Sequence, residues 1–180
     1  MISNNLDIEI LNRNLSACSE RIDSLVYSIN KNKPNFPLTL ASLDLLTEDQ
    51  KESVDALILR YSQCVSMIQD HLFRGIALAE QEDLSNKSNR DKSLLMEKLG
   101  VIRSADEFGT ATVLRNKFSH HYPEESQAQL DKLNLLIEEA VFVVEVFDYV
   151  VEYSTEKAFA REGNTWGSHA EKLARSNPHT

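Results

Sequence analysis

One ten-residue stretch of the sequence gathers side chains that could act on a phosphate group. It reads Leu-Arg-Asn-Lys-Phe-Ser-His-His-Tyr-Pro over residues 114–123. Arg115 offers a planar fork of N–H donors that matches phosphate oxygens, and His120 belongs to the residue type that can take and give a proton near neutral pH. Asn116 adds a neutral hydrogen-bonding amide, and Tyr122 adds a hydroxyl group. The stretch therefore predicts a site directed at phosphate.

The spacing of these groups sets how they could meet. Arg115 and His120 are five positions apart, which is about 140° around a helix axis, whereas Asn116 and His120 are four apart and share one face. The helix cannot run far beyond this point, because the residue before Pro123 avoids helical dihedral angles. We expect the arginine to flank a groove whose other side holds the amide and the histidine. A symmetric dimer would line one cleft with two such sets.

An arginine and a histidine placed in this way suit the cleavage of RNA without a metal ion. The 2′-hydroxyl would attack the neighbouring phosphate, with His120 moving a proton and Arg115 stabilising the charge on the phosphoryl oxygens. The alternative is that Arg115 pairs with an acidic neighbour and that His120 caps the helix C-terminus, where a cation is favoured. His121 is expected to be an exposed neighbour. No metal site and no cofactor is expected, since no cysteine or second histidine cluster lies nearby.

The R-x4-H-x-Y spacing resembles the signature of the HEPN family (higher eukaryotes and prokaryotes nucleotide-binding), most closely its toxin-like members that pair with a minimal nucleotidyltransferase. Residues 97–108 are similar to the approach to that motif, and residues 55–61 to the start of the family's long second helix. The resemblance implies the ribonuclease toxin of a toxin–antitoxin pair, with Arg115 and His120 catalytic and Asn116 orienting the site.

The same resemblance implies that Tyr122 is where the partner nucleotidyltransferase attaches adenylate. A bulky anion there would block the cleft and compete for Arg115. The alternative is a packing tyrosine that pins the turn before Pro123. Two other functions stay open for the whole chain: a non-catalytic module that partners a nucleotidyltransferase, and a structural helical adaptor in which the motif is incidental.

The charge of the chain limits its partners. With 28 acidic against 19 basic residues, the net charge is −9. This argues against a protein that coats nucleic acid with a broad basic face. An acidic protein can still cut RNA at a small cationic cleft, and it can bind a basic protein partner.

The composition favours an all-α fold. The chain has 180 residues, only five glycines and four prolines, and 42% hydrophobic residues, which suits one helical domain with a sizeable core. We expect an antiparallel, HEPN-like bundle of four to five helices over residues 1–160 and a loosely structured tail over 161–180. No apolar run reaches membrane length and no secretory segment is visible, so a soluble, cytoplasmic protein is expected. Cys18 and Cys64 are expected to be buried thiols.

Local signals mark where the helices begin and end. Thr47 and Gln50 form a predicted capping box, as do Ser104 and Glu107, and Gly100 is well placed as a C-terminal cap. The polar residues 81–90 predict a flexible surface loop. The motif lies on the helix that follows Ser104. The other expected helices cover residues 5–31, 47–80, 92–99 and 125–159.

The last of these helices is apolar on more than one face. A helix of this kind must bury more than one face. Packing inside the bundle can cover one side, and we expect a second subunit to cover the other, which predicts a homodimer.

Four residues outside the motif carry weaker signals. His71 could face the cleft, although such a group more commonly forms solvated pairs along its own helix. Glu138 and Glu139 resemble a carboxylate pair, but no matching histidine accompanies them. Trp166 is expected to anchor the tail to the body of the protein.

Overall fold

A computed structural model describes residues 2–119, 126–161, 166 and 168–174. All the regular elements among these residues are helices, which confirms the predicted all-α class. In chain order they are α1 (Ile2–Asn32), the short 3-10 helix η1 (Lys33–Asn35), α2 (Leu40–Asp44), α3 (Glu48–Met67), the π-helical η2 (Ile68–Leu72), α4 (Phe73–Ala79), α5 (Asn89–Leu99), α6 (Ala105–Ser119), α7 (Ser126–Glu156) and α8 (His169–Ala174).

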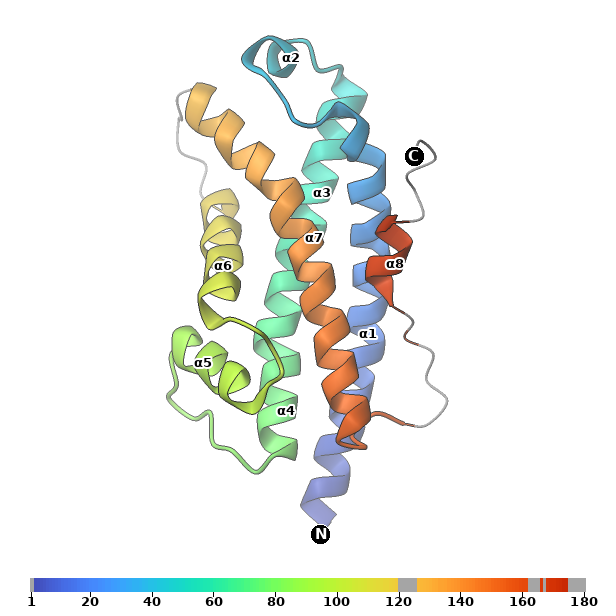
Figure 1. The fold of residues 1–180 in the computed structure, drawn as a ribbon, viewed down its shortest axis with the longest axis vertical. Helices are drawn as coiled ribbons and strands as arrows, with labels where there is room; N and C mark the ends of the chain where they lie inside the picture. The colour runs from blue at the N-terminus through green and yellow to red at the C-terminus, as the bar shows by residue number, and fades with distance from the viewer. Residues whose placement is uncertain (1, 120–125, 162–165, 167, 175–180) are drawn as a thin grey trace.

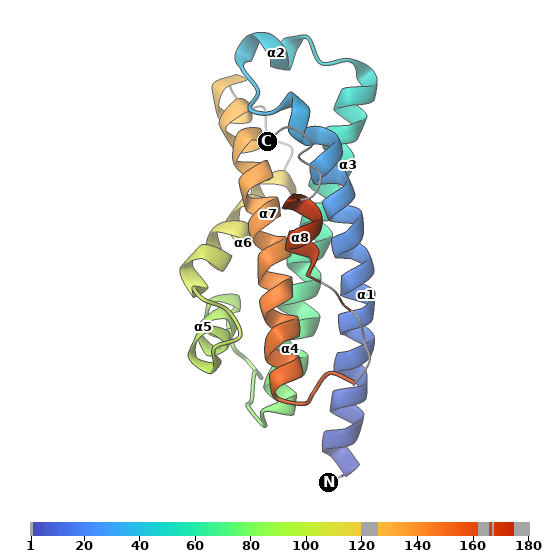
Figure 2. The ribbon, with the colours of Figure 1, turned by 45° about the vertical axis from the view of Figure 1, so that its right-hand side comes forward.

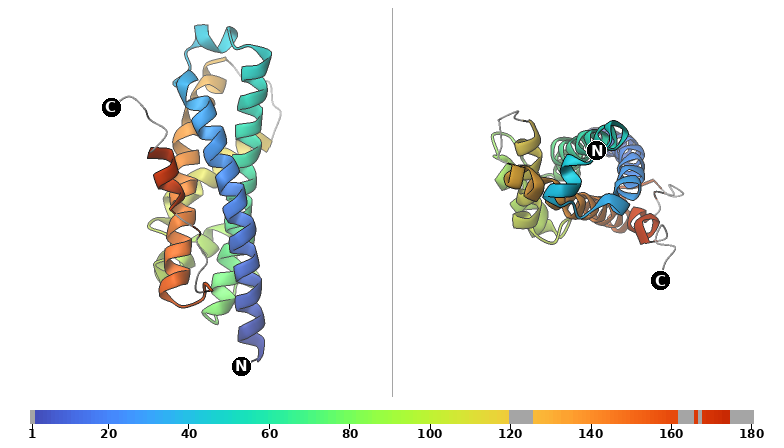
Figure 3. Two further views of the ribbon diagram at one scale, coloured as in Figure 1. Left: turned by 90° about the vertical axis from the view of Figure 1, so that its right-hand side faces the viewer. Right: turned by 90° about the horizontal axis from the view of Figure 1, so that it is seen from above.

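The long helices run along the long axis of the molecule. Figure 1 shows α1, α7 and the continuous rod of α3, η2 and α4 side by side, with α5 and α6 against one flank and α2 across one end. The view from above in Figure 3 shows the three long elements surrounding a common centre. That centre is the hydrophobic core, whose largest fully buried side chains include Tyr61, Phe73, Phe108 and Phe147. No described helix combines the length and the apolar content that a membrane span requires.

Gly100 and the box of Thr47 and Gln50 form as predicted, and Ser104 forms one of the two hydrogen bonds of its predicted box. The Thr47 hydroxyl accepts the Gln50 N–H at 3.3 Å, and the Gln50 side chain accepts the Thr47 N–H at 2.9 Å. Gly100 ends α5 with a φ of 81°, which a residue without a Cβ adopts at no steric cost. The Ser104 hydroxyl accepts the Glu107 N–H at 3.2 Å at the start of α6. Local chemistry therefore sets these helix ends.

Two features of the long second helix and its loop differ from the sequence analysis. The helix runs from residue 48 to 79 as predicted, but it contains a π-helical turn at η2, which the apolar spacing does not reveal. Helix α5 begins at Asn89, three residues before the predicted start, because the Ser88 side chain accepts the Asp91 N–H and Asp91 accepts the Ser88 N–H. The loop between the two helices is correspondingly shorter.

Helix α7 packs much of its apolar surface within the chain. It packs against α1, α3, α6 and α8. None of the large apolar side chains that are exposed among the described residues belongs to α7. The chain itself thus covers much of the apolar surface of α7, and a homodimer stays a prediction that the fold does not require.

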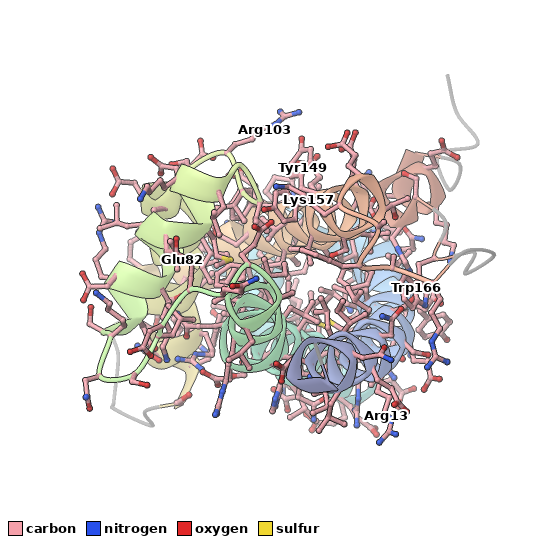
Figure 4. The ribbon with its side chains drawn as sticks, turned by 90° about the horizontal axis from the view of Figure 1, so that it is seen from below. Arg13, Glu82, Arg103, Tyr149, Lys157 and Trp166 are labelled. Carbon is pink, nitrogen blue, oxygen red and sulfur yellow. The ribbon has the colours of Figure 1, made fainter. Side chains whose placement is uncertain are left out.

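Part of the segment expected to be a loose tail is helical and docked. Helix α8 lies against α1 and α7 (Figure 2), and Leu173 and His169 are buried, the latter with 1% of its surface exposed. Trp166 packs against the core, as expected of an anchor (Figure 4). The six residues of α8 show neither a clear apolar stripe nor a local capping pair. The sequence alone therefore does not identify this helix, because the contacts that hold it come from distant parts of the chain.

One buried histidine fastens α8 to the bundle. The His169 Nδ1 atom lies 3.1 Å from Asp148 Oδ1, and its Nε2 atom lies 3.2 Å from Ser19 Oγ. The ring also meets Phe147 edge-on, with 5.2 Å between centroids. The Asp148 carboxylate accepts the backbone N–H groups of His169 and Ala170 and so caps α8 as well. Helices α1, α7 and α8 thus share one polar clasp.

We expect His169→Ala to weaken this clasp. The substitution removes a buried ring with two polar contacts and leaves Ser19 and Asp148 without them, which costs about 1–3 kcal/mol in the free energy of unfolding. Urea unfolding followed by circular dichroism measures the change. His71→Ala is the matched control, because His71 is exposed, and exposed substitutions change stability by roughly 0.5 kcal/mol or less. Equal stability of the two variants would contradict the role of the clasp.

Candidate functional site

Helix α6 carries the described part of the motif and is held firmly against the bundle. The Tyr61 hydroxyl of α3 donates to the Ala111 carbonyl at 2.7 Å inside the core. The rings of Phe73 and Phe108 lie 4.9 Å apart. Just before α6, the Arg103 guanidinium lies over the Tyr149 ring of α7 at 4.3 Å (Figure 4). These contacts fix the rotation of α6 about its own axis.

That rotation turns Arg115 inward. Its guanidinium is half-buried, and its Nη1 atom donates to Ser66 Oγ of α3 at 2.8 Å. Its Nε atom is buried and has no hydrogen-bond partner. No carboxylate among the described residues pairs with it, so the alternative in which Arg115 serves an acidic neighbour finds no support there. A cation is therefore held in place with no carboxylate partner among the described residues.

The residue that follows Arg115 in the motif faces solvent. Asn116 is exposed, on a different face of α6 from Arg115, as a rotation of about 100° per residue requires. Helix α6 is described as far as Ser119, whose hydroxyl donates to the Arg115 carbonyl at 3.2 Å. The other candidates of the motif, His120, His121 and Tyr122, lie outside the described residues. The structure thus places the arginine and the amide, and the proximity of Arg115 to His120 stays a prediction.

A half-buried carboxyl group on α7 is a second feature of this part of the bundle. Glu139 of α7 is half-buried, and its Oε2 atom has no hydrogen-bond partner. Burial raises the pKa of this carboxyl, and the negative charges of Glu138 and Glu107 raise it further. Its position offered a signal, because it falls three residues after Leu136 and four before Val143 on the buried face of the helix.

Glu139 and Arg115 both act on Tyr61. Burial raises the pKa of the Tyr61 hydroxyl, Glu139 raises it further, and Arg115 acts in the opposite direction. A carboxylate and a guanidinium thus act on one buried phenol at the junction of α3, α6 and α7. A carboxyl with a raised pKa can carry a proton nearer to neutral pH than an ordinary glutamate, which makes Glu139 a candidate for proton transfer.

The remaining candidates are accounted for more simply. His71 is exposed on η2. Cys18 and Cys64 are buried and form no disulfide, as predicted, and burial raises the pKa of the Cys64 thiol to about 12. Among the described residues, no group of three or more ligating side chains could hold a metal ion.

The clasp residues Ser19, His169 and Asp148 have the order of a hydrolase triad. The arrangement lacks what such chemistry needs. Ser19 lies in the middle of α1, where backbone N–H groups are committed to the helix and cannot form an oxyanion hole. The serine and the histidine are both buried, which leaves a substrate no access. The contacts serve to dock α8.

No family model, no curated protein and no solved structure matches this chain. The likeness to HEPN proteins therefore rests on the motif and its flanking segments.

We expect Glu139→Gln to stabilise the protein near neutral pH. The pKa of Glu139 is raised on folding, so its folded state favours the protonated form. The contribution to stability is fully present below the unfolded pKa of about 4.3 and is lost as the pH rises through the folded value. Glutamine imitates the protonated form and should keep that contribution at pH 7.

Urea midpoints between pH 4 and pH 8 measure this effect. The advantage of the glutamine variant should shrink as the pH falls. Glu145→Gln on the exposed side of the same helix is the control, and its difference from the wild type should be small throughout. A Glu139→Gln variant that tracks the control would show that this carboxyl is solvated.

Proposed function

We propose that the protein is a metal-independent endoribonuclease, the toxin of a toxin–antitoxin pair, which cuts RNA at a cleft shared by two copies of the chain. One observation carries the proposal. Arg115 is half-buried in a protein of net charge −9, yet its described hydrogen bond goes to the neutral Ser66 hydroxyl. A guanidinium that no described carboxylate pairs with is suited, in that setting, to bind a phosphate.

The proposed reaction needs only side chains. The 2′-hydroxyl of the RNA attacks the adjacent phosphorus and loses its proton to a base, the bond to the 5′-oxygen breaks, and that oxygen receives a proton from an acid. The products end in a cyclic phosphate and a 5′-hydroxyl. His120 supplies the proton transfer, Arg115 stabilises the charge that develops on the phosphoryl oxygens, and Asn116 orients the group.

The proposed partner is a minimal nucleotidyltransferase that acts as the antitoxin. It would attach adenylate to Tyr122, whose added negative charge would attract Arg115 and close the site to RNA. The acidic surface of the chain suits a partner with a basic face. This regulation rests on the resemblance that the motif carries, whereas the homodimer rests on the apolar faces of α7 and on the cleft that two copies of the motif would line.

We expect the wild-type chain, expressed without its partner, to cut RNA with or without a chelator. His120→Ala removes the proton carrier and should lower the rate about a hundredfold or more. Arg115→Ala removes the phosphate clamp and should have an effect of similar size, about a hundredfold. Gel-based cleavage of a defined RNA and the growth of the expressing cells measure both.

His121→Ala is the internal control for this experiment, and its rate should stay near that of the wild type. Cleavage by His120→Ala at the wild-type rate would remove the ribonuclease function. If the wild type cuts no RNA, the non-catalytic module that binds a nucleotidyltransferase takes its place.

We expect Tyr122→Phe to abolish adenylation by the cognate nucleotidyltransferase in the presence of ATP. The phenyl ring lacks the oxygen that would form the bond to phosphorus, while the packing volume stays nearly the same. Mass spectrometry of the intact chain and its peptides measures the added nucleotide. Tyr27→Phe is the matched control, because Tyr27 is 62% exposed and far along the chain. Modification that persists on Tyr122→Phe would place the site elsewhere.

A further inference from the structure

We infer that a cavity beside α6 binds a nucleotide, with the base inside and the phosphate at the rim. The cavity has a volume of about 490 Å³ and lies between η2, α5 and α6, within the range of about 300–1,000 Å³ typical of small-molecule sites. Leu114, which lines it, directly precedes Arg115. The inference rests on the proposed function, in that this nucleotide is a unit of the RNA substrate next to the cleaved phosphate.

The floor of the cavity holds an amide that lacks a partner. Gln69 lines the cavity and is 2% exposed, and its Oε1 atom has no hydrogen-bond partner. A buried polar atom without a partner is costly and calls for an explanation. Rotation about the last torsion of the side chain, which is broad, exchanges the amide oxygen and nitrogen. The floor can therefore offer either an acceptor or a donor to the edge of a base.

The backbone at this position is also unusual. Gln69 belongs to the π-helical η2, which interrupts the rod formed by α3 and α4. Such single turns are uncommon, and they occur frequently at functional sites because they change the direction of nearby side chains. Here Ile68, Gln69 and Leu72 are all buried. The π-helical turn thus buries the Gln69 amide between apolar neighbours. The regular spacing of apolar residues along the helix would not have placed a polar side chain there.

The rim of the cavity carries a positive charge on Lys117, which lines it from the same helix as Arg115. Arg90 also lines it, from α5, in an ion pair with Asp106, which is itself a lining residue. The first residue of α5, Asn89, lies at this cavity as well, and helix N-termini favour anions. A phosphate group can therefore sit at the rim while the attached base reaches the floor.

The walls between rim and floor are mainly apolar. They include Val113, Leu114, Leu135 and the backbone of Gly109. An inorganic anion would leave these walls and Gln69 unused, and a purely apolar ligand would leave the amide unpaired and the rim charges unused. A nucleotide supplies all three features, because its base has flat apolar faces and a hydrogen-bonding edge and its phosphate is an anion.

The full-length chain should be titrated calorimetrically with the four ribonucleoside 3′-monophosphates and with inorganic phosphate. We expect at least one nucleotide to bind more tightly than phosphate. Gln69→Leu should weaken that binding about tenfold, the effect of losing one buried hydrogen bond. The variant should fold, because leucine has a similar volume and removes an atom that has no partner. Gln63→Leu on α3, outside the cavity, is the matched control and should bind as the wild type does.

Gly109→Leu tests the same site without touching the amide. A Cβ atom at Gly109 would meet Arg90 Nη1 at 3.7 Å, an ordinary contact, and nothing closer. Leucine also has a higher helix propensity than glycine. The longer side chain should fill the cavity, and nucleotide binding should fall at least tenfold, while inorganic phosphate at the rim should be affected less.

The outcomes separate this inference from the proposed function. Nucleotides that bind no more tightly than phosphate, or variants at positions 69 and 109 that bind as the wild type does, would overturn the nucleotide pocket even if the chain cuts RNA. Nucleotide binding that both variants weaken, in a chain that cuts no RNA, would support the pocket and remove the proposed function.

Discussion

The hydrogen bond from the Tyr61 hydroxyl to the Ala111 carbonyl is the contact on which the arrangement of the candidate site depends. It joins α3 to α6 inside the core, where a donor left without its partner would cost about 1–3 kcal/mol. Because burial holds the pKa of Tyr61 well above its ordinary value, the hydroxyl keeps its proton and the bond does not vary over physiological pH. With this point fixed, Leu114 turns into the core, Arg115 reaches Ser66, and Asn116 faces outward.

The helices were predictable from the sequence because their limits are set by neighbouring residues. The box of Thr47 and Gln50 and the left-handed Gly100 each act over a few residues, and each could be identified without knowledge of the fold. The capping box of Ser88 and Asp91 is equally local, but the sequence analysis did not identify it. Its N3 residue is an aspartate, whereas the usual residue at N3 of a capping box is glutamate or glutamine.

The features that the sequence could not predict depend on contacts between distant segments. His169 meets Ser19 across 150 residues of chain, and this clasp lets α8 cover part of α7. The apolar faces of α7, taken without α8, therefore predicted a second subunit on this helix. The direction of Gln69 depends on a π-helical turn, and the pKa of Glu139 depends on Glu107 from another helix. For the candidate site, the sequence identified Arg115 through its pattern but not its described surroundings, in which Ser66 and no carboxylate is its partner.

A single helix links the parts of the site that the structure describes. Arg115 contacts Ser66 of α3, while Leu114 and Lys117 line the cavity on the side of α5. Both sets of contacts follow from one rotation of α6, so a ligand that spans them would meet a guanidinium and a pocket in fixed relation. Under the proposed function such preorganisation would matter, because an acidic surface repels RNA except where a few fixed cations outweigh it. The net charge of −9 would then oppose non-specific binding of RNA and leave productive contact to fixed cations such as Arg115 and Lys117 of α6.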